Sequence, residues 1–204
     1  MTDFKMIKDA DGIATIVWDC PNKSINVMNM ESMHQLDVFI KNSLDDEEVK
    51  GIIITSGKKD FAGGMDLNVL AQMKANSGKN PAKGVFEGIM MMHNALRKIE
   101  RAGMDLKTNK GGKPIATVLT GTAMGIGLEL PLATHRIFAA DNPKAKIGFP
   151  EVNIGLIPGS GATQRLPRIV GPEMALDLCI SGENVPVQEA FESKLVDKIL
   201  LHDL

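Results

Sequence analysis

The sequence is poor in the residues that mark several large classes of protein. It has no tyrosine, one tryptophan and only two cysteines, Cys20 and Cys179, in 204 residues. Two cysteines so far apart do not form the disulfide framework of a small secreted domain. The N-terminal segment MTDFKMIKDADG carries acidic residues and has neither the apolar core of a secretory signal nor the arginines of a transit peptide. We therefore expect a reducing, cytoplasmic location.

Excess charge and long apolar runs are also missing. The 23 Lys and Arg residues nearly balance the 25 Asp and Glu residues, for a net charge of −2, so nothing suggests a nucleic-acid partner. No apolar run approaches the roughly 18 residues that a membrane-spanning helix needs. The hydrophobic fraction of 44% and the charged fraction of 24% are typical of a folded globule. The length suits one domain.

Several familiar signatures of cofactor and metal sites are absent. After Gly125 and Gly127, the third glycine of a dinucleotide-binding G-x-G-x-x-G segment would be residue 130, which is leucine. The GGKP segment at 111–114 does not match a phosphate-binding loop, and there is no G-x-S-x-G nucleophile turn. The four histidines are scattered and no Cys/His pair has zinc spacing. A metal, a dinucleotide cofactor and a serine nucleophile are therefore not expected.

What remains is a regular alternation of strand and helix patterns. Alternating apolar residues around Asp11 and Gly12 predict a hairpin over 4–19. The other predicted strands are 51–55, 114–119, 137–140, 146–149 and 196–200. One predicted helix is capped by Asn29, and the others cover 67–75, 85–99, Gly125 to Ala133, 162–169, 172–180 and 187–194. Residues 76–81 are predicted to form a loop. This pattern predicts an α/β fold without an internal linker, in which 51–75 and 114–134 are similar strand–glycine turn–helix passages.

Two glutamates stand out because their neighbours are apolar. Glu129 lies within GLELPL at 127–132, and Glu151 follows the segment IGFP at 147–150. A buried carboxylate is costly unless it is protonated or hydrogen-bonded, so such acids are candidates for function. Either residue could instead face solvent, and for Glu151 taken alone an exposed loop is the more common case. Together they would suit a general acid and a general base acting on one substrate.

Glycines cluster at the ends of the two buried strands. Gly63 and Gly64 follow the first strand, and Gly125 and Gly127 follow the second. Glycine lets the backbone approach a ligand closely and leaves N–H groups available. Two such turns side by side could direct two donors at one oxygen, as in an oxyanion hole. The alternative is a pair of tight turns that serve packing alone.

Three motifs, in order over almost the whole chain, resemble those of one enzyme family. The segment 61–67, FAGGMDL, resembles F-x-A-G-x-D-L/I, and 120–130, TGTAMGIGLEL, resembles N-G-x-A-x-G-G-G-x-E-L. The segments 148–152, GFPEV, and 155–166, GLIPGSGATQRL, resemble G-x-P-E followed by G-x-x-P-G-x-G-G-T-Q-R-L. These are motifs of the crotonase, or enoyl-CoA hydratase/isomerase, superfamily.

The resemblance implies a crotonase-like ββα spiral that acts on an acyl-CoA thioester as a trimer or a dimer of trimers. It assigns the backbone N–H groups of Met65 and Ile126 to the thioester oxygen. Glu129 would be the base that activates water, and Glu151 the acid that protonates the α-carbon. The residues placed along the substrate and CoA path are Ala62, Gly64, Asp66, Leu67, Gly125 and Gly159. Coenzyme A belongs to the substrate, so no separate cofactor and no metal are expected.

A narrower resemblance concerns the segments 23–28, KSINVM, and 141–144, DNPK. They are most similar to the hydratase part of multifunctional fatty-acid oxidation proteins, which implies a 3-hydroxyacyl-CoA dehydrogenase part or a thiolase as partner. Beyond LVDK at 195–198, the family continues with C-terminal helices that cover the substrate and build the trimer. We therefore expect residues 1–204 to be a crotonase-like domain that is incomplete at its C-terminus.

These features predict an enoyl-CoA hydratase of fatty-acid β-oxidation. One alternative is an enoyl-CoA isomerase of the same family, which can work with a single acid; the presence of two favours the hydratase. Another alternative is a folded fragment or partner subunit that turns over little substrate.

Overall fold

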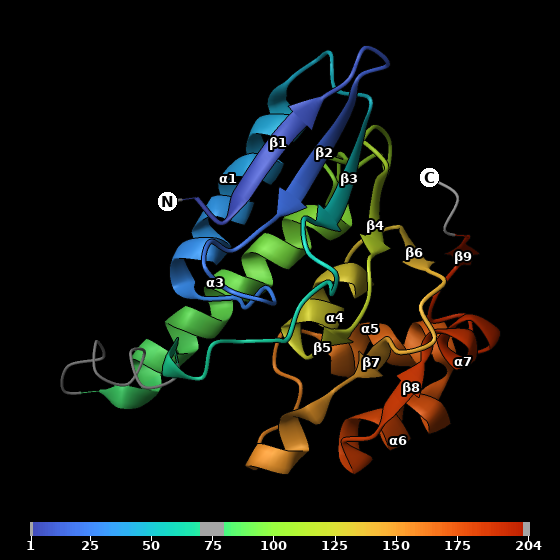
Figure 1. Ribbon diagram of the computed structural model, residues 1–204. Coiled ribbons are helices and arrows are strands. Elements are labelled where there is room, and N and C mark those ends of the chain that lie inside the picture. Colours follow the sequence, from blue (N-terminus) through green and yellow to red (C-terminus); the bar gives the residue numbers. More distant parts are fainter. Residues whose placement is uncertain (1, 70–79, 202–204) are drawn as a thin grey trace.

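A six-stranded sheet forms the upper part of the molecule in the computed structural model, which describes residues 2–69 and 80–201 (Figure 1). Its strands, in spatial order, are β1 (Phe4–Lys8), β2 (Ile13–Trp18), β3 (Gly51–Ser56), β4 (Ile115–Leu119), β6 (Arg136–Ala140) and β9 (Lys198–Leu200). The β1–β2 hairpin is antiparallel, and every other neighbouring pair is parallel.

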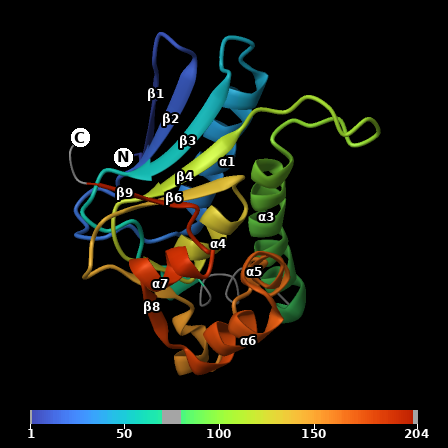
Figure 2. The same ribbon diagram turned by 90° about the vertical axis from the view of Figure 1, so that its right-hand side faces the viewer.

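Two long helices, α1 (Met30–Asp45) and α3 (Pro81–Arg101), cover one face of this sheet (Figure 2). Alternate residues of β2 are fully buried, because successive side chains of a strand point to opposite faces. The apolar stripe of α1 is buried along Met33, Leu36 and Ile40. As predicted, Asn29 caps this helix, and its side chain accepts a hydrogen bond from the N–H of Ser32 at 2.8 Å.

A smaller three-stranded sheet organises the C-terminal half. It contains β5 (Ala123–Met124), β7 (Lys146–Gly148) and β8 (Asn184–Pro186), with β5 parallel to β7. The surrounding helices are α4 (Ile126–Leu132), the 3₁₀ turn η1 (Pro150–Ile154), α5 (Ala162–Val170), α6 (Pro172–Ser181) and α7 (Val187–Glu192). Since parallel strands end at the same edge of a sheet, α4 and η1 both begin at the edge where β5 and β7 end.

The predicted α/β architecture is confirmed, as are the N-terminal hairpin, the two buried strands and the long helices. The sequence did not predict β5, β8 or η1, because elements of two to five residues carry no clear periodicity. The predicted helix over 67–75 and the loop at 76–81 lie largely outside the described residues. Within the described ranges, no helix is long and apolar enough to cross a membrane.

Candidate active site

The edge at which β5 and β7 end carries both candidate acids. Ala123 pairs with Ile147 along these strands, and just beyond them the N–H of Gly125 donates to the carbonyl of Gly148 at 3.0 Å. Glu129 follows β5 in the first turn of α4, and Glu151 follows β7 in η1. The pairing of two short parallel strands therefore brings together two acids that are 22 positions apart in the sequence, from 129 to 151.

Glu129 is buried rather than directed to solvent, with 2% of its surface exposed. One of its oxygens, Oε1, accepts hydrogen bonds from the N–H of Ser160 at 2.7 Å and from the N–H of Ala162 at 3.1 Å. Burial raises the pKa of Glu129, and these two backbone donors act against that rise by favouring the ionised form. The carboxylate is held in one orientation, and neither backbone bond uses its second oxygen.

Glu151 is half-buried, and it is not the exposed loop acid that its neighbours alone would suggest. Its Oε2 atom is buried without a hydrogen-bond partner among the described residues. Its Oε1 atom lies so close to Gly125 that a Cβ on that glycine would be 2.6 Å away. Burial first, and then the negative charge of Glu129, raise the pKa of Glu151 to about 7. This acid can therefore release and regain a proton near neutral pH.

The glycine turn at 63–64 lies directly against the glycine turn at 125–127. Ala62 forms a parallel bridge with Ala123, and the N–H of Met124 donates to the carbonyl of Ala62 at 3.0 Å. Gly127, in the first turn of α4, faces the same alanine: a Cβ at Gly127 would lie 2.7 Å from the Ala62 Cβ. Only glycine permits this approach, so the position contributes to the juxtaposition of the two turns.

The N–H of Met65 points toward this shared region. The carbonyl of Gly64 accepts a hydrogen bond from the N–H of Met28 at 2.9 Å. Because the carbonyl and the N–H of a trans peptide point in opposite directions, the N–H of Met65 faces away from Met28, toward the side on which Ala123 lies. No backbone acceptor within the described residues takes this N–H.

Ile126 carries the second predicted donor. It is the first residue of α4, so its N–H leaves the helix at the N-terminus, and it too has no backbone acceptor among the described residues. Gly125, with φ +53°, adopts the unusual backbone conformation, and the β-branched Ile126 keeps a helical one. The two predicted donors therefore come from adjacent turns beside the acids.

Three of the other predicted residues lie in or beside these turns. Ala62 is fully buried in the contact with α4, and Gly64 is buried with φ +111°. Gly159 is exposed and immediately precedes Ser160, one of the two residues that bind Glu129.

The next two predicted residues lie nearer the surface. Asp66 accepts a hydrogen bond from the N–H of Asn68 at 3.0 Å, and this bond is the main reason that its pKa lies below the usual value. Its other oxygen lies 3.6 Å from the Nζ atom of Lys23. Leu67 is 61% exposed. Both residues follow Met65 directly in the chain.

Sequence reasoning missed the residues that hold Glu129. They belong to the turn before α5, where Gly161 has φ +111° and its neighbours Ser160 and Ala162 donate their N–H groups. Arg165 fixes the turn by donating from Nη1 to the Ser160 carbonyl at 3.1 Å. The segment PGSGA at 158–162 was the available signal, since glycines before a helix favour exposed N–H groups.

No group of three or more metal-binding side chains occurs within the residues that the structure describes. The site instead offers one oriented buried acid, one acid that titrates near neutrality, and two backbone donors. This combination suits proton transfer to and from a carbonyl compound whose oxygen gains negative charge.

Comparison with known proteins identifies the family. A family model described as enoyl-CoA hydratase/isomerase matches residues 8–203, and the chain belongs to this family. An enoyl-CoA hydratase of Geobacillus kaustophilus is 30% identical over 98% of this chain and 69% of its own, with a TM-score of 0.84. One from Thermoplasma volcanium is 28% identical over 98% of this chain and 72% of its own, with a TM-score of 0.82. The predicted crotonase-like fold is thereby confirmed.

The contact between Gly127 and Ala62 gives a first prediction. Replacing a helical glycine by alanine ordinarily stabilises a helix by up to about 1 kcal/mol. Here the added Cβ would lie 2.7 Å from the Ala62 Cβ, so we expect Gly127→Ala to destabilise the protein by about 1–3 kcal/mol, measured by denaturant unfolding. The second substitution Ala62→Gly should recover part of the loss. A stabilised Gly127→Ala protein would contradict the close packing of the two turns.

Glu151 should also set a pH dependence of stability. Its pKa is about 7 in the folded protein and 4.5 ordinarily, so between these values the folded chain holds more protons than the unfolded chain. The free energy of unfolding of the wild type, measured relative to that of Glu151→Gln, should therefore fall as the pH rises from about 4.5 to about 7. Above about pH 7 this difference should stay constant. Denaturant titrations across this range measure it. Parallel curves for the two proteins would mean that Glu151 is not perturbed.

Proposed function

We propose that this chain catalyses the addition of water to a trans-2-enoyl-CoA, giving a 3-hydroxyacyl-CoA. The observation that carries the proposal is that two perturbed acids, Glu129 and Glu151, lie beside two backbone N–H groups that no backbone acceptor of the described residues takes. Membership of the enoyl-CoA hydratase/isomerase family supports an acyl-CoA substrate.

The N–H groups of Met65 and Ile126 would receive the thioester oxygen. When water adds to the double bond, negative charge moves onto this oxygen and forms an enolate. Donors that are already oriented stabilise this charge more than they stabilise the uncharged substrate, and loss of one such donor typically costs about 10²–10³-fold in rate. Ala62, Gly64, Asp66 and Leu67 would then line the CoA path on one side, and Gly125 and Gly159 would border the acyl group and the water.

The two acids would divide the proton transfers. Glu129, held through Oε1, would take a proton from water with its other oxygen while the water oxygen bonds to the β-carbon. The π electrons of the double bond move into the enolate, which then takes a proton from Glu151 at the α-carbon. The cycle leaves Glu129 protonated and Glu151 ionised, so both exchange protons with solvent before the next turnover. Glu151 can do so near neutral pH because its pKa is about 7.

An isomerase remains the second candidate within the family. Moving a double bond needs one group that carries a proton between two carbons, whereas hydration uses one acid and one base. Burial of both Glu129 and Glu151 favours hydration, because a second buried carboxyl without a role would only cost stability. Conversion of a 3-enoyl-CoA at a rate above that of crotonyl-CoA hydration would favour the isomerase instead.

The wider setting is also part of the proposal. We place the reaction in fatty-acid β-oxidation in the cytoplasm, within a multifunctional protein that has a 3-hydroxyacyl-CoA dehydrogenase part or a thiolase partner. The support is the resemblance at 23–28 and 141–144. We also propose that the protein assembles into trimers or hexamers. Mass measurement in solution tests this, because a strictly monomeric chain with low turnover would favour a folded but poorly active fragment or partner subunit.

Substitution of the acids gives the central test. Loss of crotonyl-CoA absorbance on adding the protein measures hydration directly, and its absence at high protein concentration would refute the hydratase. Glu129→Gln and Glu151→Gln should each lower kcat by about 10²–10⁴-fold, the usual contribution of a general acid or base. Their free energies of unfolding should stay within about 1 kcal/mol of the wild type, once compared at a pH where both acids are neutral.

Exposed Glu47 provides the matched control, and Glu47→Gln should keep full activity. Near-full activity in either acid variant would remove that residue from the mechanism.

A further inference from the structure

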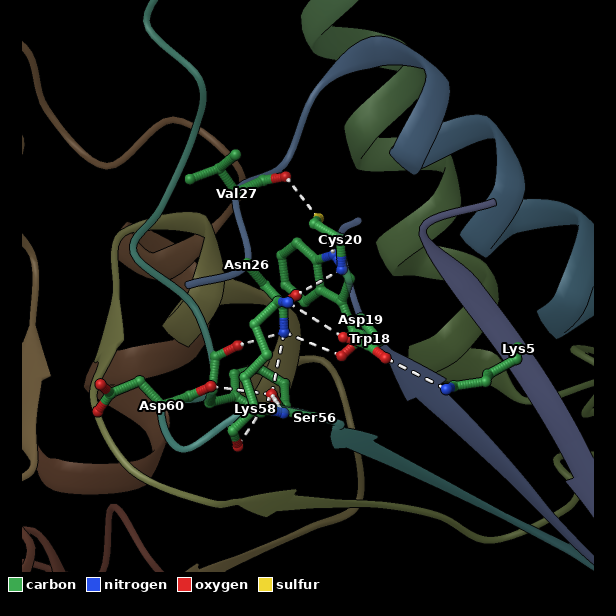
Figure 3. A network of polar contacts seen from close by, with 10 residues as sticks. Lys5, Trp18, Asp19, Cys20, Asn26, Val27, Ser56, Lys58 and Asp60 are labelled. Atoms are coloured by element: carbon green, nitrogen blue, oxygen red, sulfur yellow. Dashed lines mark hydrogen bonds and ion pairs between the residues drawn. The ribbon is translucent and has the colours of Figure 1, made fainter. Parts of the chain in front are cut away.

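Asn26 lies at the centre of a buried polar network that does not include Glu129 or Glu151 (Figure 3). It belongs to the connection between β2 and α1 and is fully buried, with 0% of its surface exposed. Its Oδ1 atom accepts a hydrogen bond from the N–H of Cys20 at 2.9 Å. Its Nδ2 atom lies within donating distance of the Trp18 carbonyl at 2.9 Å, the Ser56 hydroxyl at 3.0 Å and the Phe61 carbonyl at 3.0 Å.

These partners belong to three different parts of the fold. Trp18 ends β2, Ser56 ends β3, and Phe61 begins the turn that leads to Met65. The side chain of Asn26 therefore joins the ends of two central strands to the start of a candidate oxyanion turn. A buried amide whose donors and acceptor are all engaged is rigid, because moving it would leave polar groups unpaired.

The backbone that follows Asn26 continues this attachment. The carbonyl of Asn26 accepts from the N–H of Gly63 at 2.8 Å. Two residues later, the N–H of Met28 donates to the carbonyl of Gly64 at 2.9 Å, and the carbonyl of Met28 accepts from the N–H of Asp66 at 2.8 Å. These last two bonds flank Met65, and the one at Gly64 orients the peptide whose N–H is the candidate oxyanion donor.

We propose that Asn26 is a positioning residue for the Met65 N–H donor. This inference rests on the proposed function, in which that donor receives the thioester oxygen. Asn26 anchors residues 26–28 to the ends of β2 and β3, and residues 26–28 in turn hold the Gly64 peptide. Without the amide, the Gly64 peptide loses its fixed direction while both acids stay in place, since their hydrogen bonds come from α5 and from the edge of β5 and β7.

A purely structural role predicts something different. Loss of buried hydrogen bonds would then lower stability but leave the surviving folded protein with normal polarisation of the substrate. The distinguishing quantity is the carbonyl stretching frequency of a bound thioester, which falls when the oxygen accepts hydrogen bonds. Butyryl-CoA labelled with ¹³C at the carbonyl is a suitable probe, because it is saturated and cannot be hydrated.

The experiment compares Asn26→Ala with the wild type by difference infrared spectroscopy and by kcat and KM on crotonyl-CoA. We expect the carbonyl of bound probe to return most of the way to its frequency in solution. We expect kcat to fall about 10–100-fold, which is less than outright loss of a donor, with a smaller change in KM. Each protein is assayed at the same margin below its own melting temperature.

Three further variants make the result decisive. Ser56→Ala removes one partner of Asn26 and should give the same changes on a smaller scale, which keeps the test open if Asn26→Ala does not fold. Ser43→Ala removes a fully buried hydroxyl of α1 and should change neither frequency nor kcat. Glu129→Gln should lower kcat by about 10²–10⁴-fold while keeping the wild-type frequency.

The outcomes separate this inference from the function on which it rests. Wild-type frequency and kcat in both folded Asn26→Ala and folded Ser56→Ala would overturn the positioning role and leave the hydratase standing. A wild-type protein that neither shifts the carbonyl of the probe nor hydrates crotonyl-CoA would overturn the proposed function, and the role of Asn26 with it.

Discussion

The pairing of a two-residue strand on both of its sides is the constraint on which the candidate site depends. On one side, Ala123 and Met124 pair with Ile147 and Gly148, and on the other side Ala123 forms a bridge with Ala62. The first contact brings η1 and Glu151 to the start of α4, and the second brings the Met65 turn there. Shifting this strand by one residue would turn its side chains to the opposite faces and separate all three parts.

The two acids at this edge, Glu129 and Glu151, have different hydrogen-bonding surroundings. Glu129 loses nearly all of its hydration but gains two backbone donors from the turn before α5, and Arg165 stiffens that turn through the Ser160 carbonyl. Among the described residues, the buried Oε2 of Glu151 has no hydrogen-bond partner, and burial raises the pKa of this carboxyl to about 7. Burial raises the pKa of both carboxyls, and the two backbone donors to Glu129 act against that rise by favouring its ionised form.

Sequence reasoning predicted the large elements and singled out two acids that the fold buries wholly or in part, and the reasons are local. The stripe of α1 and the β-branched run of β3 are periodic over many residues, and apolar neighbours flagged Glu129 and Glu151. The partners of these acids could not be read in the same way. Ser160 is 31 positions from Glu129, and the three-dimensional link between them runs through a turn whose sequence has no period. The network around Asn26 likewise joins segments up to 35 positions apart.

The two donors share a physical origin that explains why glycine precedes each of them. A strand that continued regularly past Ala62 or past Met124 would spend its N–H groups on the neighbouring strand. Gly64 and Gly125 have φ values of +111° and +53°, which interrupt the pairing one residue before Met65 and Ile126. Within the described part of the chain no backbone acceptor takes the N–H groups that follow, and a donor left unsatisfied in a buried position typically costs about 1–3 kcal/mol. In the proposed function, a ligand oxygen placed between the two N–H groups would offset such a cost, so the interruptions of strand pairing are the features that would receive a carbonyl.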